Sequence, residues 1–118
     1  LPADGEAVAD AVASVRRIFR AHGFEAAITV NLLDDRSLEG VISLAFRRDD
    51  PAEAERAQRA VREAEEDLWQ RGCPPYRVGL GSMDLVVRPE DPFWQIVARL
   101  KDVFDPDDVI SPGRYNLR

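Results

Sequence analysis

Three Asp-Pro dipeptides constrain the fold of this chain more than any other feature of its sequence. At Asp50-Pro51 and Asp91-Pro92 the aspartate can cap a helix and the proline suits its first turn, so each pair predicts a helix start. Glu53 is expected to complete a capping box at the first of them. At Asp105-Pro106 the effect is opposite, because the residue before a proline avoids helical backbone angles, and a helix is expected to end there.

Apolar residues recur at helical spacing in three segments of the chain. The first helix is expected at about residues 5–22 and ends at Gly23, the second runs from Asp50 to a stop at Gly72, and the third lies between Pro92 and Asp105. Their apolar stripes consist of Val8, Val12, Val15 and Phe19; of Ala54, Ala57, Val61, Ala64 and Leu68; and of Phe93, Val97, Leu100 and Phe104.

Two β-type segments lie between the first two helices. Residues 24–32 alternate apolar and polar side chains, and after a polar break at residues 34–37 a second run spans 40–46, which predicts an antiparallel hairpin. The order helix, strand, strand, helix is an α+β pattern, and two strands alone are marginal. We therefore expect a further strand before Leu1, in a larger polypeptide of which this chain is a C-terminal piece.

Length and charge exclude several classes of protein. The 118 residues fit one domain with its own core and leave no room for a second, and the net charge of −6 offers no basic face for nucleic acid or an anionic membrane. No apolar run reaches the roughly 20 residues that cross a bilayer, so we expect a soluble, cytoplasmic chain, with any targeting signal upstream. One cysteine, Cys73, and one histidine, His22, are too few for a disulfide or an ordinary zinc site, and no metal is expected.

Two stretches carry the chemistry. In GCPPYRVGLGSMD, residues 72–84, Tyr76 and Arg77 place a phenol beside a guanidinium in a loop stiffened by proline and glycine, which suits an anion clamp. The second stretch, LKDVFDPDDVISPGRY, covers residues 100–115 and contains the pattern LK-x-x-x-DP-x-x-x-I-x-PG-R. An isolated Tyr-Arg pair would ordinarily be a surface feature; its position upstream of the second pattern favours a functional role.

Together the two stretches resemble the C-terminal part of the vanillyl-alcohol oxidase and p-cresol methylhydroxylase family of FAD-linked oxidases. The resemblance implies that residues 1–118 form the C-terminal segment of a substrate-covering cap, a ferredoxin-like half made of helix, hairpin and helix, plus a C-terminal helix and tail. About residues 85–118 would return toward an FAD-binding domain. FAD would come mainly from that domain, which is the chain's own N-terminal partner, and a homodimer is compatible with the family.

The same resemblance implies roles for three residues. Tyr76 would hydrogen-bond the phenolic oxygen of the substrate, Arg77 would stabilise the phenolate and negative charge on the flavin, and Arg114 would contact the cofactor. The implied reaction is oxidation of a para-substituted phenol at its benzylic carbon by hydride transfer to FAD, which this chain cannot perform alone. Val78-Gly79 replaces the usual Thr-His after the pair, so the cavity is expected to differ in shape.

Two other functions stay open from the sequence. One is the cap of an FAD-linked oxidase or dehydrogenase that acts on 2-hydroxy acids, which we rank lower because the His-rich signature of those caps is missing. The other is a small ferredoxin-like binding module without redox chemistry. Oxygen and a cytochrome both stay open as electron acceptors, as do covalent and non-covalent flavin.

Overall fold

The chain divides into two compact units, each with its own core. The structure is a computed structural model that describes residues 1–117; the first unit is Leu1–Tyr76 and the second begins at Arg77. The expectation of a single core is wrong, because the buried apolar residues form two separate clusters. Helix and hairpin residues make the first cluster, whereas the second joins the segment after Arg77 to the tail.

Local capping explains where the first two helices begin and end. Helix α1 (Gly5–Ala21) starts where Asp4 accepts a hydrogen bond from the Ala7 amide at 2.8 Å, and it ends before Gly23, whose φ of +79° suits glycine. Helix α2 (Pro51–Gln70) was predicted with nearly these bounds, and it ends before Gly72, whose φ is +74°.

Only half of the predicted capping box is present at α2. Asp50 Oδ1 accepts from the amides of Ala52 and Glu53 at 3.0 and 3.1 Å, as expected. The Glu53 carboxylate does not return to the Asp50 amide; it accepts from Arg47 Nε at 2.9 Å. A charge-assisted bond to a guanidinium is stronger than one to a neutral amide, which explains the exchange.

The predicted antiparallel hairpin is confirmed, with shifted ends. Strand β1 (Ala27–Leu32) pairs with β2 (Leu38–Ser43), with Ile28 opposite Ile42. The turn between them is held by Asp34, whose Oδ1 accepts from the amides of residues 36 and 37. Phe24 is packed into the core and lies outside the strand, so β1 begins later than its alternating pattern suggested.

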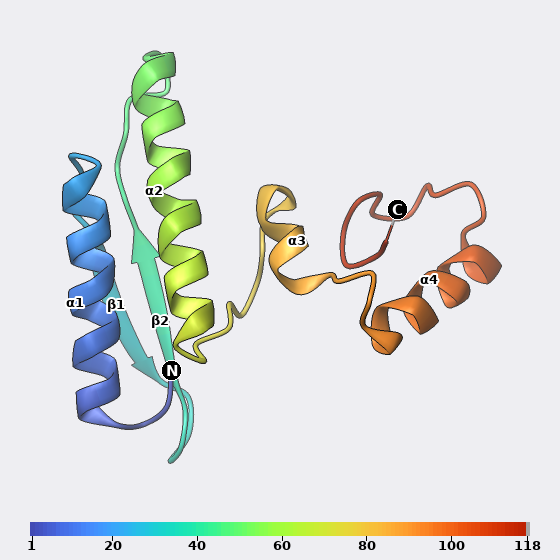
Figure 1. The fold of residues 1–118 in the computed structure, drawn as a ribbon, viewed down its shortest axis with the longest axis horizontal. Coiled ribbons are helices and arrows are strands. Elements are labelled where there is room, and N and C mark those ends of the chain that lie inside the picture. The colour runs from blue at the N-terminus through green and yellow to red at the C-terminus, as the bar shows by residue number, and fades with distance from the viewer. Residues whose placement is uncertain (118) are drawn as a thin grey trace. The chain divides into compact units, whose positions relative to one another are not determined.

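Helices α1 and α2 cover one face of the hairpin (Figure 1). The side chains of Ile28 and Ile42 point into this layer, and the opposite face is mostly polar. The core beneath the helices consists of Val15, Ile18, Phe19, Phe24, Ala57, Ala60 and Ala64. The first unit is thus an α+β layer, and the α+β class is confirmed.

The second unit is helical and small. It contains the 3₁₀ turn η1 (Leu80–Ser82), the short helix α3 (Met83–Val86) and helix α4 (Pro92–Phe104). Its buried apolar residues are Val78, Met83 and Val87. The prediction of α4 is confirmed, with Asp91 accepting from the Phe93 amide at 2.8 Å. The turn and the short helix were not predicted, because neither has a side-chain cap to mark it.

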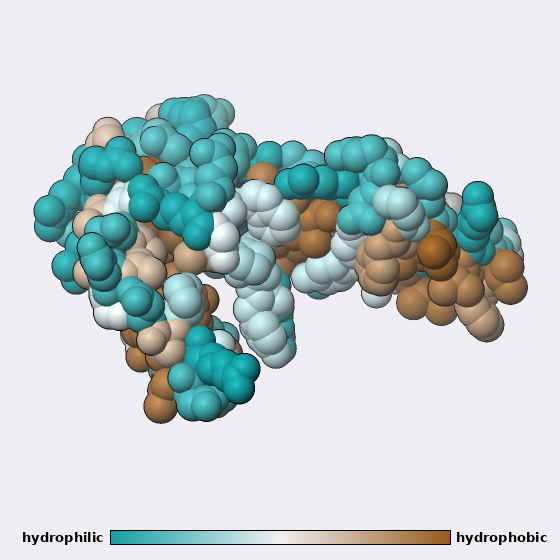
Figure 2. Space-filling view, turned by 60° about the horizontal axis from the view of Figure 1, so that its bottom comes forward, coloured by the Kyte–Doolittle hydropathy of each residue, from teal (hydrophilic) through white to brown (hydrophobic). Residues whose placement is uncertain are grey.

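The apolar stripe of α4 is exposed. No residue of this helix is fully buried, and Phe104 is 76% exposed. Figure 2 shows hydrophobic residues gathered on the surface of this unit. The exposed members are Phe93, Ile96, Leu100, Val103 and Phe104 on the helix and Val109 and Ile110 after it. Across residues 1–117, no helix combines the length and apolarity that crossing a bilayer requires.

Candidate functional site

Tyr76 and Arg77 lie in the irregular segment that follows α2. Tyr76 is 75% exposed, Arg77 is also exposed, and neither belongs to a helix or a strand. Tyr76 closes the first unit and Arg77 opens the second. Both side chains are therefore presented to the surroundings, as a clamp for an anion from outside the chain requires.

A hydrogen bond joins the Arg77 segment to the C-terminal tail. The amide of Val78 donates to the Tyr115 hydroxyl at 3.2 Å, and the amide of Tyr115 lies 3.4 Å from the sulfur of Met83. Val78 is buried, with 6% of its surface exposed. The two stretches that carried the family resemblance thus meet in one unit, where Arg77 and Arg114 are each one residue away from the bonded pair.

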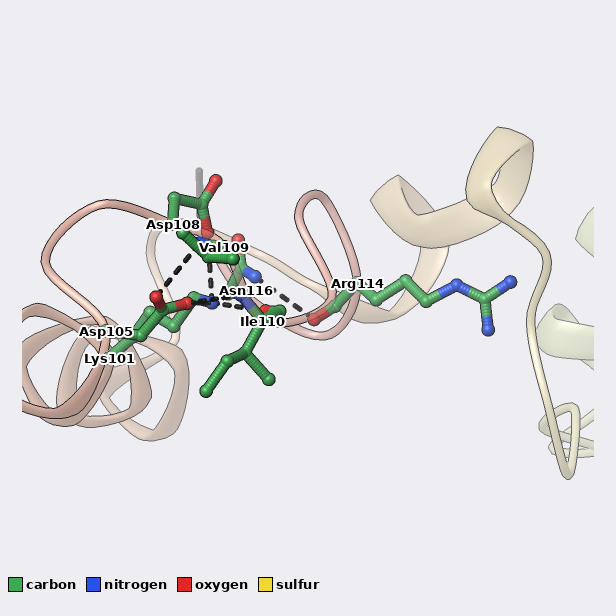
Figure 3. A network of polar contacts seen from close by, with 7 residues as sticks. All are labelled: Lys101, Asp105, Asp108, Val109, Ile110, Arg114 and Asn116. Carbon is green, nitrogen blue, oxygen red and sulfur yellow. Dashed lines mark hydrogen bonds and ion pairs between the residues drawn. The ribbon is translucent and has the colours of Figure 1, made fainter.

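The pattern residues of the tail form a closed polar network (Figure 3). Lys101 Nζ donates to the Asp105 carboxylate and to the Ile110 carbonyl, and it forms an ion pair with Asp108 Oδ1 at 3.0 Å. Asp105 in turn accepts from the amides of Val109 at 2.9 Å and Ile110 at 2.8 Å. The Lys, Asp and Ile of the LK-x-x-x-DP-x-x-x-I pattern therefore hold the tail against the end of α4.

Electrostatics within this network favour both charged forms. The Lys101 ammonium lowers the pKa of the buried Asp105 carboxyl, and the amides of Ile110 and Val109 act in the same direction. Asp105 raises the pKa of Lys101 in return, with a further contribution from Asp108. Lys101 is consequently engaged by its own chain, whereas the Arg114 side chain extends away from this network (Figure 3).

The backbone of the tail is strained next to Arg114. Asp108, Ser111 and Tyr115 have φ values of 50°, 49° and 50°, in the left-handed region that side chains with a Cβ avoid, and Gly113 has a φ of +69°. Such residues persist only where surrounding contacts impose them, and they concentrate at functional sites. Here the Asp105 network and the Tyr115 hydroxyl supply those contacts on either side of the turn.

Arg114 lies beside an open, mostly apolar hollow of about 220 Å³. Figure 3 shows its side chain extending away from the polar network, while its carbonyl accepts from Asn116 Nδ2 at 3.1 Å. The lining residues are Val97, Lys101, Phe104, Asp105, Ile110, Arg114, Tyr115 and Asn116. Pockets that enclose a drug-sized ligand are commonly about 300–1,000 Å³, so this hollow suits a group that it contacts from one side.

The exposed groups of this segment and of the tail can donate hydrogen bonds to an anionic oxygen of a ligand. Guanidinium and phenol donors are suited to an anionic flavin or phenolate oxygen. An open hollow of about 220 Å³ cannot enclose a cofactor as large as FAD.

Several other titratable residues have structural partners. The His22 ring lies 2.8 Å from Glu63 Oε2 at the end of α1, and Asp67 pairs with Arg71 at 2.6 Å. The first contact links the end of α1 to α2, and the second lies within α2 and its C-cap. Cys73 is a free thiol. Within residues 1–117 there is no group of three or more His, Cys, Asp or Glu side chains placed to hold a metal ion.

Two features of the site were missed by sequence reasoning. The Tyr115 hydroxyl accepts a hydrogen bond from the Val78 amide, which lies 37 positions earlier in the chain. No local sequence pattern predicts this contact. The Lys101–Asp105 pair did leave a signal, since i, i+4 spacing at the end of a helix allows such a pair, and Asp105 was interpreted only as a helix stop.

The comparison with known proteins relates the chain to a decarboxylase. It is 33% identical, over all 118 residues, to 1'-carboxy-chondrochloren decarboxylase of Chondromyces crocatus. The chain spans 22% of that protein's length, and that protein is named as a decarboxylase and not as a vanillyl-alcohol oxidase. No family profile matches the chain, and no solved structure matches it.

Proposed function

We propose that this chain is the C-terminal substrate-domain segment of an FAD-dependent oxidoreductase that oxidises para-substituted phenols at the benzylic carbon. The observation that carries the proposal is the meeting of the Tyr76-Arg77 segment and the Arg114 turn through the Val78–Tyr115 hydrogen bond. This bond joins the backbone beside Arg77 to the turn that contains Arg114 within the second unit, and guanidinium groups suit recognition of a phenolate or an anionic cofactor.

The chemistry assigns separate tasks to the two clamp residues. Tyr76 donates a hydrogen bond to the phenolic oxygen of the substrate, and the positive charge of Arg77 favours the ionised phenolate. The phenolate pushes electron density toward the benzylic C–H bond, and loss of hydride leaves a p-quinone methide. FAD, when bound, supplies the hydride acceptor. Removing a preorganised donor of this type commonly slows an enzyme about 10²- to 10³-fold.

We further propose that the first unit is half of a ferredoxin-like cap and that the second unit returns toward the FAD-binding domain. Support for the second part comes from α4, whose apolar residues are exposed along its length. An apolar helix face of this kind ordinarily packs on another surface. The partner that we propose is the FAD-binding domain of the same polypeptide.

A second candidate function is decarboxylation. It is favoured by the 33% identity to a decarboxylase over the full length of this chain. A carboxylate on the substrate would find cationic donors in Arg77 and Arg114, the same residues that the phenol reading uses. The two candidate functions therefore use the same two arginines for binding and differ in which bond of the substrate breaks.

The test is anaerobic addition of a 4-hydroxybenzylic alcohol to the native full-length protein while its visible spectrum is followed. Bleaching of a flavin spectrum would support the phenol oxidation, and Tyr76→Phe and Arg77→Ala should each slow it at least about tenfold, or about 1.4 kcal/mol. Arg48→Ala, at an exposed arginine of the first unit, is the matched control and should leave the rate unchanged.

Four outcomes would contradict the proposed phenol oxidation. Equal rates of flavin reduction in the three variants would contradict the roles assigned to Tyr76 and Arg77. A flavin that stays oxidised would contradict the proposed substrate class. Release of carbon dioxide from a carboxylated 4-hydroxyphenyl substrate, without reaction of the alcohol, would favour decarboxylation. Protein that carries no flavin would overturn the redox proposal itself.

A further inference from the structure

The N-terminal residues already form the beginning of a third strand. Leu1 and Leu38 exchange two backbone hydrogen bonds, of 2.9 and 2.8 Å, and the Ala3 amide donates to the Arg36 carbonyl at 2.9 Å. Pro2 forms an antiparallel bridge with Ser37 between these pairs. Residues 1–3 therefore run antiparallel to the start of β2, and Figure 1 shows the N-terminus at this end of the hairpin.

The remainder of this edge of β2 is open. In an antiparallel strand successive residues direct their amide and carbonyl groups to opposite sides. Because Leu38 bonds to Leu1, the backbone groups of Gly40 and Ile42 also point away from β1. No backbone hydrogen bond to these outward groups of Gly40 or Ile42 is present among residues 1–117. Each residue added before Leu1 would move one position along β2 toward them.

The direction of the Leu1 side chain determines which residues of such a strand would face the helices. A Cβ placed on Gly40 would lie 3.1 Å from Leu1 Cδ1, so the Leu1 side chain lies on the same face as position 40. That face is the one on which Ile42 packs against the core below the helices. By the two-residue period of a strand, the second and fourth residues before Leu1 would face the helices, opposite Gly40 and Ile42.

We propose that this edge is completed by an extended strand formed by the residues that immediately precede Leu1 in the native polypeptide. It runs antiparallel to β2, pairs with Glu39 to Ser43 through five residues, and carries apolar side chains two and four positions before Leu1. A two-stranded sheet is only marginally stable, and an open strand edge can pair with other chains. A third strand would stabilise the sheet and cover this edge. The decarboxylase relative, of which this chain spans 22%, has additional chain to supply such a segment.

This inference rests on the larger polypeptide of the proposed function and is independent of its flavin chemistry. The test compares amide hydrogen exchange in the 118-residue chain and in the same chain extended upstream by about eight residues of its own gene. The extension should slow exchange of the Gly40 and Ile42 amides at least about tenfold. The Val41 amide faces β1 in both proteins and serves as the internal control, with no change expected.

The alternatives to this strand give different hydrogen-exchange results. Unchanged exchange at Gly40 and Ile42 in the extended chain overturns the proposal, as does a native protein whose mature N-terminus is Leu1. Protection that rises with concentration in the 118-residue chain would place a second copy on this edge and would also overturn it. Protection by the extension in a protein that never reduces flavin would keep the strand and refute only the proposed function.

Discussion

The Tyr115 hydroxyl gives the sharpest test of how the site is assembled, because it is the bond that joins the Arg77 segment to the tail. Tyr115→Phe removes the acceptor of the Val78 amide, 3.2 Å away, and leaves the ring in place. A buried amide left without a partner costs about 1–3 kcal/mol. Tyr115 is 41% exposed, which lets water replace part of the lost bond, so the lower end, about 1 kcal/mol, is expected.

Urea unfolding followed by tryptophan fluorescence measures this loss. Trp94 packs against the core of the second unit, so a Trp69→Phe background restricts the signal to that unit. With a slope of about 1 kcal/mol/M, the loss of about 1 kcal/mol moves the midpoint down by about 1 M. Amide exchange at Val78 should rise about fivefold, the rate equivalent of the same free energy.

Tyr76→Phe is the matched control, since it removes a hydroxyl from an exposed tyrosine in the first unit. It should leave the Val78 amide and the Trp94 transition unchanged. An unshifted midpoint together with unchanged Val78 exchange in Tyr115→Phe would refute the argument that this bond holds the two stretches together.

Two further predictions concern acid sensitivity and the first core. Because the folded-state pKa of Asp105 lies below its ordinary value of 3.8, the stability that it contributes is present above that value and is lost only as the pH falls through the lowered pKa. The Ile110 amide resonance should therefore stay dispersed to below about pH 3.8 and collapse in more acid solution, and Asp105→Asn should remove that acid step; the same titration in both proteins would contradict this. Phe19→Ala should destabilise the first unit by about 3–5 kcal/mol because it empties a buried site, whereas Leu32→Ala, at an exposed position, should cost less than about 0.5 kcal/mol, both measured by urea unfolding that follows Trp69 of the first unit in a Trp94→Phe background. Equal losses in the two variants would contradict the assigned core.

Much of the secondary structure followed from the sequence because its signals are local. An aspartate before a proline can cap only the helix that starts there, and Gly23 and Gly72 end helices because they accept positive φ. The alternation of residues 24–32 predicted a strand for the same reason, since a strand has a fixed two-residue period. The resemblance of residues 72–84 and 100–115 to a flavoenzyme family likewise needed only their order along the chain.

What the tertiary structure decided depends on contacts between residues distant in the chain. The Val78–Tyr115 bond and the separate second core cannot be read from any one segment, because their partners are tens of residues apart. The Glu53 carboxylate accepts a hydrogen bond from Arg47 and not from the Asp50 amide that was its predicted partner. A hydrogen bond from a charged guanidinium is stronger than one from a neutral amide. The sequence alone thus determined where three helices and two strands form and marked Tyr76, Arg77 and Arg114 as candidate site residues, and three-dimensional packing decided which segments meet.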